Sequence, residues 1–176
     1  MGDGRKEREM NERGESGKAG RIISVNISRR KGTVKKPVAE AELVAGKGVA
    51  GDAHLGFAHR QVSLLMMESI EEQRKRFEEL AIQSCDAIKG KKIRIEPGAF
   101  AENLTTRGID LSSLKIGDEL RINKKIRLRV SQIGKECHTH CAIYHLVGEC
   151  IMPSLGIFCE VLEGGAVKPG DRIERV

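Results

Sequence analysis

Two thiols and two imidazoles fall within five residues of this chain, in the segment Cys137-His138-Thr139-His140-Cys141. The segment directly follows an apolar, strand-like run at 126–133 and the cation Lys135. A neighbouring ammonium and nearby imidazoles favour the thiolate form of Cys137 over the thiol. Because a thiolate binds metal, attacks electrophiles and carries sulfur, the segment indicates metal or sulfur chemistry at Cys137.

The other cysteines leave more than one interpretation open. If a helix begins at Cys137, Cys141 shares its face and the two thiols could act as carrier and resolving thiol, or both hold metal. A structural zinc site is an alternative, although the usual C-x2-C pairs are absent. Its ligands would be Cys137, His138 or His140, Cys141 and Cys150. The remaining two cysteines are expected in the core: Cys85 and Cys159.

Composition limits the classes of protein that this chain can be. Its 176 residues suit one domain, and we expect a disordered, charge-mixed arm over 1–20 followed by a single domain over 21–176. The chain has no Trp, one Tyr and four Phe, which argues against a stacking platform for single-stranded nucleic acid. A net charge of +6 suits a small anionic ligand such as a phosphate, or a modest attraction for nucleic acid.

We expect a cytoplasmic protein. The first 20 residues lack the apolar core of a signal peptide. Five cysteines in a chain without a signal peptide point to metal or redox chemistry rather than a disulfide framework. No run approaches the roughly 18–20 apolar residues that a membrane span needs.

Short strands and tight turns dominate the rest of the sequence. Alternating or apolar runs predict strands at 22–27, 41–44, 61–65, 92–95, 119–122, 126–133 and 171–176, and one helix at 68–82. Two similar segments, 115–122 and 168–175, place a Gly-Asp turn before a strand. This pattern predicts a mainly β fold, a small closed β-barrel with a few peripheral helices.

Four sequence elements in fixed order carry a resemblance to a known family. They are Gly51-Asp52-Ala53-His54; Arg60-Gln61-Val62-Ser63-Leu64; Pro97-Gly98-Ala99-Phe100-Ala101-Glu102-Asn103-Leu104; and Ile116-Gly117-Asp118 followed by Lys135-Glu136-Cys137. The set resembles the MOSC family, the domain found at the C-terminus of molybdenum cofactor sulfurases and also as stand-alone bacterial proteins. The segment 148–158 resembles a stand-alone bacterial subgroup. The likeness covers residues 20–176.

The resemblance implies a fold like the pyruvate-kinase barrel domain and a molybdopterin-type ligand. It also implies a functional cysteine, at Cys137, that carries sulfur or ligates molybdenum. The chain departs from the family at Ala101, where glycine is common, and in the rich Cys/His content of 137–141. Nothing in it resembles a pyridoxal-phosphate desulfurase domain, so a separate sulfur donor would be needed.

Several residues are candidates for the pocket that such a ligand would occupy. Asp52 and His54 form an acid-x-His pair that can orient an imidazole toward a ligand, or simply a turn closed by the Asp side chain. Arg60 offers a guanidinium fork suited to the pterin phosphate, and Lys31 in the basic turn could add charge or merely face solvent.

The loop headed by Pro97-Gly98 supplies further candidates. Asn103 has donors and an acceptor for the edge of a heterocycle, and Glu102 could bind pterin nitrogens or clamp an arginine. A loop closed by its own hydrogen bonds is the alternative. Thr105 could contribute a pocket hydroxyl, whereas Phe100 is expected in the core.

Three functions follow from these observations. The first is a molybdenum-cofactor-binding protein in sulfur transfer or cofactor handling, partnered by a cysteine desulfurase or other sulfur donor and by molybdoenzymes or cofactor biosynthesis proteins. The second is a molybdenum-dependent reductase of N-hydroxylated compounds. It would need an electron-transfer protein, because the chain lacks ferredoxin-like cysteine spacing and a Gly-x-Gly-x-x-Gly fingerprint. The third is a zinc-stapled module that meets nucleic acid through its basic surface.

Overall fold

The computed structural model of the chain describes residues 17–83, 95–136 and 150–176. The elements of these ranges are β1 (Ala19–Ile27), β2 (Lys36–Val38), β3 (Ala41–Val44), β4 (Gly48–Val49), β5 (Val62–Met66), α2 (Met67–Gln83), β6 (Leu104–Arg107), β7 (Glu119–Ile122), β8 (Ile126–Ile133), α4 (Met152–Leu155), β9 (Ile157–Glu163), β10 (Gly165–Val167) and β11 (Arg172–Arg175).

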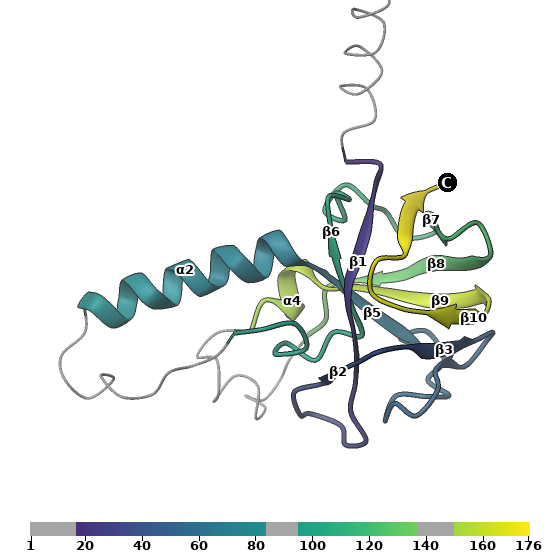
Figure 1. The fold of residues 1–176 in the computed structure, drawn as a ribbon, viewed down its shortest axis with the longest axis horizontal. Coiled ribbons are helices and arrows are strands. Elements are labelled where there is room, and N and C mark those ends of the chain that lie inside the picture. Colours follow the sequence, from purple (N-terminus) through teal and green to yellow (C-terminus); the bar gives the residue numbers. More distant parts are fainter. Residues whose placement is uncertain (1–16, 84–94, 137–149) are drawn as a thin grey trace, which may run out of the picture.

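Seven strands close into a mixed β-barrel, in the order β11-β7-β8-β9-β5-β6-β1, with β1 pairing back to β11 (Figure 1). All of these neighbours run antiparallel except β5 and β6, which are parallel and are joined through α2. Strand β2 pairs with the second half of β1, and β10, β3 and β4 form a small second sheet. The predicted fold, a mainly β closed barrel with peripheral helices, is confirmed.

Apolar side chains that alternate along the strands fill the barrel. In β8, Ile126, Leu128 and Val130 are buried, while Arg127 and Arg129 between them reach the surface. This alternation follows from the two-residue period of a strand. Each fully buried aliphatic side chain contributes about 1.5–3 kcal/mol through removal of apolar surface from water.

A second apolar cluster lies outside the barrel and connects α2 and α4 to the loop before β6. Ile70 of α2 and Met152 of α4 are buried in it together with Phe100, which confirms that residue as a core side chain. Helix α2 extends away from the barrel (Figure 1), and the sequence predicted it to within one residue at each end. No helix of the described residues is long and apolar enough to cross a membrane.

The two Gly-Asp turns have the same geometry. The Asp118 carboxylate accepts a hydrogen bond from the Lys115 backbone N–H at 2.8 Å, and Asp171 accepts one from the Lys168 N–H at 2.9 Å. The glycine before each Asp has a φ of 94°, a left-handed value that favours glycine. These turns lead into β7 and β11, as the similarity of the two segments predicts.

Most predicted strands coincide with observed ones, but five observed strands were not predicted. Strands β3, β7 and β8 match their predicted bounds, β5 and β11 are shifted or shortened by one or two residues, and β1 begins at Ala19 rather than at residue 22. The unpredicted strands are β2, β4, β6, β9 and β10. Most of the predicted strand at 92–95 lies outside the described residues, as do residues 1–16 of the predicted N-terminal arm.

Candidate functional site

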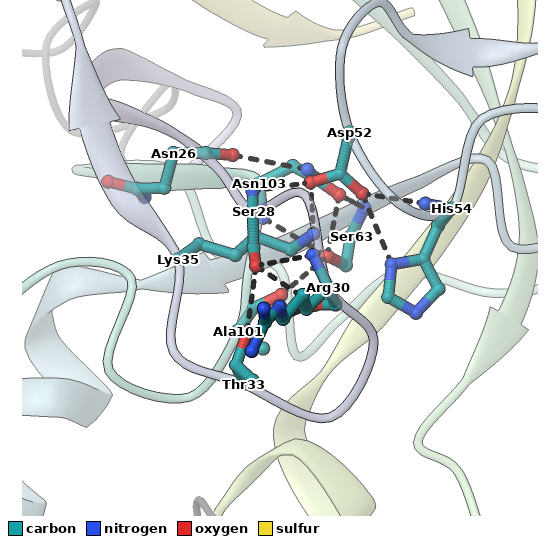
Figure 2. Close-up of polar contacts among 10 residues, drawn as sticks. All are labelled: Asn26, Ser28, Arg30, Thr33, Lys35, Asp52, His54, Ser63, Ala101 and Asn103. Carbon is teal, nitrogen blue, oxygen red and sulfur yellow. Dashed lines mark hydrogen bonds and ion pairs between the residues drawn. The ribbon is translucent and has the colours of Figure 1, made fainter.

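The Asp52 carboxylate lies at the centre of a polar site formed by three loops (Figure 2). Its Oδ2 accepts hydrogen bonds from the Lys35 ammonium and from the Ser28 backbone N–H at 3.0 Å. Its Oδ1 accepts from the His54 backbone N–H at 3.0 Å and lies 3.1 Å from His54 Nδ1. The side chains of Lys35 and Asp52 are only 2% and 1% exposed, so this ion pair is buried.

The hydrogen bonds keep the Asp52 carboxylate ionised despite its burial. Burial alone would raise the pKa of Asp52, but the bonds from His54, Lys35 and Ser28 together hold that pKa well below its usual range. Burial lowers the pKa of Lys35, and the hydrogen bond and charge of Asp52 offset part of this effect. The carboxylate therefore carries its negative charge toward His54 throughout the neutral range.

The same geometry fixes the protonation pattern of His54. An ionised carboxylate can only accept hydrogen bonds, so Nδ1 of His54 must carry the hydrogen that points to Asp52. The other ring nitrogen, Nε2, has no partner among the described residues, and the side chain is 32% exposed. His54 can therefore accept or donate a proton at Nε2 toward a ligand.

Basic residues are carried by the loops next to this imidazole. We call Arg29, Arg30, Lys31, Lys47 and Arg60 the basic rim. The loops that carry it are joined by bonds from the Ala53 N–H to the Ser28 carbonyl at 2.7 Å and from the Gly56 N–H to the Lys47 carbonyl at 2.8 Å. The Lys31 ammonium lies 4.6 Å from the centre of the Phe57 ring, which in turn lies 5.2 Å from the His54 ring.

The charges of the basic rim are not neutralised within the described part of the chain. All of its members are exposed except Arg60, which is half-buried, and none forms an ion pair with a described carboxylate. Elsewhere on the barrel, by contrast, Arg127 binds Glu119 and Glu163. The loops next to His54 therefore carry positive charge that no described carboxylate neutralises, and such charge attracts anions.

A network of buried polar side chains lies behind the ion pair. Asn103 Oδ1 accepts bonds from the Ser63 N–H at 3.2 Å and the Ser63 hydroxyl at 3.0 Å, and its Nδ2 donates to the Asn26 carbonyl at 3.1 Å. Thr105 donates to Glu102 Oε1 at 2.8 Å and accepts from Asn26. Asn103, Glu102 and Thr105, which sequence analysis assigned to the ligand, thus bind the protein itself in this structure.

The loop that carries these residues has two unusual features. Ala101 has a φ of 64°, in the left-handed region that favours glycine, at the position where the resemblance leads one to expect glycine. Glu102 is 0% exposed, and burial raises the pKa of its carboxyl group. Its Oε2, like the Thr106 hydroxyl, has no hydrogen-bond partner among the described residues.

The structure brings together several residues that lie far apart in the sequence. The Asp52 carboxylate contacts both the ring and the backbone N–H of His54, so the oriented imidazole and the turn closed by the Asp side chain are both present, and Lys31 and Arg60 belong to the basic rim on the neighbouring loops. Lys35 was missed. Its type and its place in a basic segment predict a solvated side chain, and nothing in the local sequence reveals that Asp52 draws it into the interior.

The cysteine cluster falls outside the described residues: Cys137, His138, His140 and Cys141. Strand β8 ends four residues before Cys137 in the sequence, and its Ser131 donates a hydrogen bond to the carbonyl of His59, the residue before Arg60. Cys159 is buried as predicted, and burial raises the pKa of its thiol. Cys150 is half-buried, and Cys85 lies outside the described residues.

The described residues fit part of what a molybdopterin-type ligand requires. The basic rim suits a phosphate, and His54 Nε2 suits a polar or ionisable group. In the described ranges no group of three or more His, Cys, Asp or Glu side chains could hold a metal ion. Thiolates are the soft ligands that molybdenum favours, and the family resemblance assigns this place to Cys137, which lies outside the described residues.

The fold and this site define a MOSC domain, and the chain belongs to the MOSC domain family, whose model matches residues 51–174. Three solved structures share its fold. The YuaD protein of Bacillus subtilis is 22% identical, with a TM-score of 0.66 over 89% of this chain and 95% of that one. YiiM of Escherichia coli is 20% identical, with a TM-score of 0.58 over 89% and 69%. YiiM of Geobacillus stearothermophilus is 19% identical, with a TM-score of 0.60 over 89% and 75%. A comparison with curated proteins found no match.

Proposed function

We propose that this MOSC-domain protein binds the molybdenum cofactor and acts in sulfur transfer or cofactor handling, with Cys137 as the sulfur carrier or molybdenum ligand. The proposal is carried by the Asp52–His54 dyad, in which Nε2 has no partner among the described residues, together with the basic rim, whose charges no described carboxylate neutralises. Membership of the MOSC family supports the same ligand class.

Each described residue has a distinct task in this proposal. Arg60 and Lys31 bind the phosphate of the pterin, because both are cationic and neither is committed to a described carboxylate. Asp52 holds the imidazole in one tautomer, and His54 accepts or donates a proton at Nε2. The bound cofactor would supply a metal centre able to exchange sulfur or oxygen atoms.

Sulfur carriage at Cys137 needs no oxidant or reductant. The Cys137 thiolate attacks the terminal sulfur of a donor persulfide, a new S–S bond forms at Cys137, and the old S–S bond breaks. The electron pair of the broken bond leaves with the donor, which becomes a thiolate, and the transferred sulfur keeps its hydrogen. A cysteine desulfurase is a suitable donor, because the chain itself shows no such domain.

A second candidate function is reduction of N-hydroxylated compounds, and the outward-facing His54 Nε2 favours it. Converting an N–OH group to N–H and water consumes two electrons and two protons, and a protonated His54 could deliver one of these protons from Nε2. The electrons would come from a separate electron-transfer protein. Turnover of a hydroxylamino-purine with a reduced donor, lost in His54→Gln, would support this function over sulfur carriage.

The deciding experiment is metal and sulfur analysis of the anaerobically purified protein. Wild type, Cys137→Ser and Cys150→Ser would be compared by elemental mass spectrometry. Molybdenum present in wild type and Cys150→Ser but lost in Cys137→Ser supports the proposal. Zinc lost in both variants points instead to the zinc site that uses both cysteines.

If the purified protein contains no metal, a test of sulfur loading on Cys137 decides between the outcomes. After incubation with a cysteine desulfurase and cysteine, intact-mass analysis should show the mass of one added sulfur atom on wild type and Cys150→Ser, and none on Cys137→Ser. Absence of both molybdenum and added sulfur in wild type overturns the proposal.

A further inference from the structure

Lys35 is buried in the site together with Asp52, and the proposed function gives this lysine no task. We propose that Lys35 is a positioning residue that fixes the Asp52 carboxylate and, through it, the His54 imidazole with Nε2 facing outward. The inference rests on the proposed function only in treating His54 as a working group of the site. Its test concerns the imidazole itself.

The burial of this lysine points to a positional task. A buried ammonium–carboxylate pair loses the hydration of two ions, and well-packed apolar side chains in the same place are often equally stable or more stable. Lys35 and Asp52 are nevertheless almost wholly removed from solvent. Stability alone is therefore a poor explanation for an ion pair at this position.

The pairing divides the Asp52 carboxylate into two halves. Oδ2 is held by Lys35 and the Ser28 N–H, and Oδ1 is left for His54 (Figure 2). The torsion that rotates a carboxylate is broad, so one held oxygen limits the directions that the other can take. Lys35, with the backbone N–H groups of Ser28 and His54, thus sets where Oδ1 meets Nδ1 and, because the imidazole is planar, where Nε2 points.

Lys35 is itself held by the loop before β6. Its backbone N–H donates to the Gly98 carbonyl at 2.8 Å, and a Cβ on Gly98 would lie 2.3 Å from the Lys35 carbonyl oxygen. The Gly98 N–H in turn donates to Glu102 Oε1 at 2.5 Å. A chain of contacts therefore runs from Glu102 through Gly98 and Lys35 to Asp52 and His54.

This chain gives the segment 97–104 a task that does not require it to touch a ligand. Its glycine permits the close approach to Lys35, and its buried Glu102 holds that glycine and adds negative potential at the ammonium. On the outer side, Lys31 faces Phe57, which packs on His54. Asp52, Lys35, Glu102 and Lys31 are the charged groups that these contacts link to the imidazole, and the remaining cations of the basic rim lie on the neighbouring loops.

The test is the tautomer of His54, read from the ring nitrogen signals by 15N NMR in the cofactor-free full-length chain. Wild type is compared with Lys35→Met and with the control Lys36→Met, which removes the next, exposed lysine. We expect neutral His54 to carry its hydrogen on Nδ1 alone in wild type and Lys36→Met. In Lys35→Met we expect loss of this single pattern, with both tautomers present.

A folded Lys35→Met variant whose His54 signals match wild type would overturn the inference. If Lys35→Met does not fold, the wild-type protein provides a second NMR test. Its Lys35 ammonium hydrogens should exchange slowly with water and show correlations to Asp52. Exchange as fast as that of surface lysines overturns it equally. Neither measurement uses molybdenum or sulfur, so its result does not depend on whether the proposed function is correct. If the protein binds molybdenum but Lys35→Met leaves the His54 tautomer unchanged, only the role of Lys35 is disproved.

Discussion

Asn103 and Ser63 each donate a hydrogen bond to the other within the barrel wall. The Asn103 N–H donates to the Ser63 carbonyl at 2.9 Å, while the Ser63 N–H donates to the Asn103 side-chain oxygen at 3.2 Å. Because the amide nitrogen also reaches the Asn26 carbonyl, Asn103 joins β5 to β1 just before β6 begins. An asparagine that could read a heterocycle is, in this structure, a bridge between strands.

Asn103→Ala should therefore destabilise the fold even without any ligand. Asn103 is 2% exposed, and its replacement leaves the Ser63 N–H without its side-chain acceptor. A buried donor without an acceptor costs about 1–3 kcal/mol of stability. Urea unfolding should show a loss of about this size. A double-mutant cycle with Ser63→Ala should give a coupling of about 0.5–3 kcal/mol. Unchanged stability together with weakened cofactor binding would contradict this and favour direct ligand contact.

Gly98→Ala should be more damaging than the same change at another glycine of similar conformation. Gly98 has a φ of 89° and Gly117 a φ of 94°, but only Gly98 has backbone atoms within reach of an added Cβ. Gly117→Ala should cost about 1–2 kcal/mol, the ordinary penalty of a left-handed alanine. Gly98→Ala should cost more, because Lys35 must also move. If the two variants lose the same stability in thermal unfolding, the contact between Gly98 and Lys35 does not contribute to stability.

The buried Glu102 should make stability depend on pH. Burial raises its folded pKa above the unfolded value of about 4.3, so its contribution is fully present below that value and is lost as the pH rises through the folded pKa. Glu102→Gln does not titrate. Its stability relative to wild type should therefore improve as the pH rises above about 4 and through the raised folded pKa of Glu102.

The control for this experiment is Glu40→Gln, at an exposed glutamate. Denaturant unfolding of both variants at several pH values separates a local effect at Glu102 from the general response of the protein to pH. A difference between wild type and Glu102→Gln that stays constant with pH would contradict the prediction.

The elements that the sequence predicted are those whose pattern is local. Strand β8 alternates apolar and charged residues, and the Gly-Asp turns close within four residues, so both can be read from a short window. Strand β6 could not, because it reads Leu-Thr-Thr-Arg and follows a Pro-Gly loop, yet its threonines are buried. Their burial depends on partners in β1 and β5, which local sequence does not specify.

The candidate site divides in the same way. The Asp52–His54 dyad spans three residues and was predicted, whereas the Lys35–Asp52 pair joins residues seventeen positions apart in the chain. Side-chain chemistry alone also could not decide whether Asn103 serves a ligand or a backbone, because an amide suits both. The pterin contacts of Glu102, Asn103 and Thr105 stay a prediction.

The basic rim should bind small anions beside His54. In an NMR titration with inorganic phosphate at low ionic strength, we expect the ring signals of His54 and the amides around it to shift. Arg60→Gln and Lys31→Gln should each weaken this binding several-fold, because each removes one cation that no described carboxylate neutralises. Added salt should weaken it further, since exposed charges are screened within about 8 Å at physiological ionic strength.

Arg127→Gln is the matched control for the rim variants. Arg127 is also a partly exposed arginine of the barrel, and its removal lowers the net charge by the same one unit, but it lies outside the basic rim and is paired with Glu119 and Glu163. Phosphate binding should therefore survive in this variant. Equal weakening by Arg127→Gln and Arg60→Gln would mean that phosphate responds only to the net charge of +6, and the phosphate role of Arg60 would have to be abandoned.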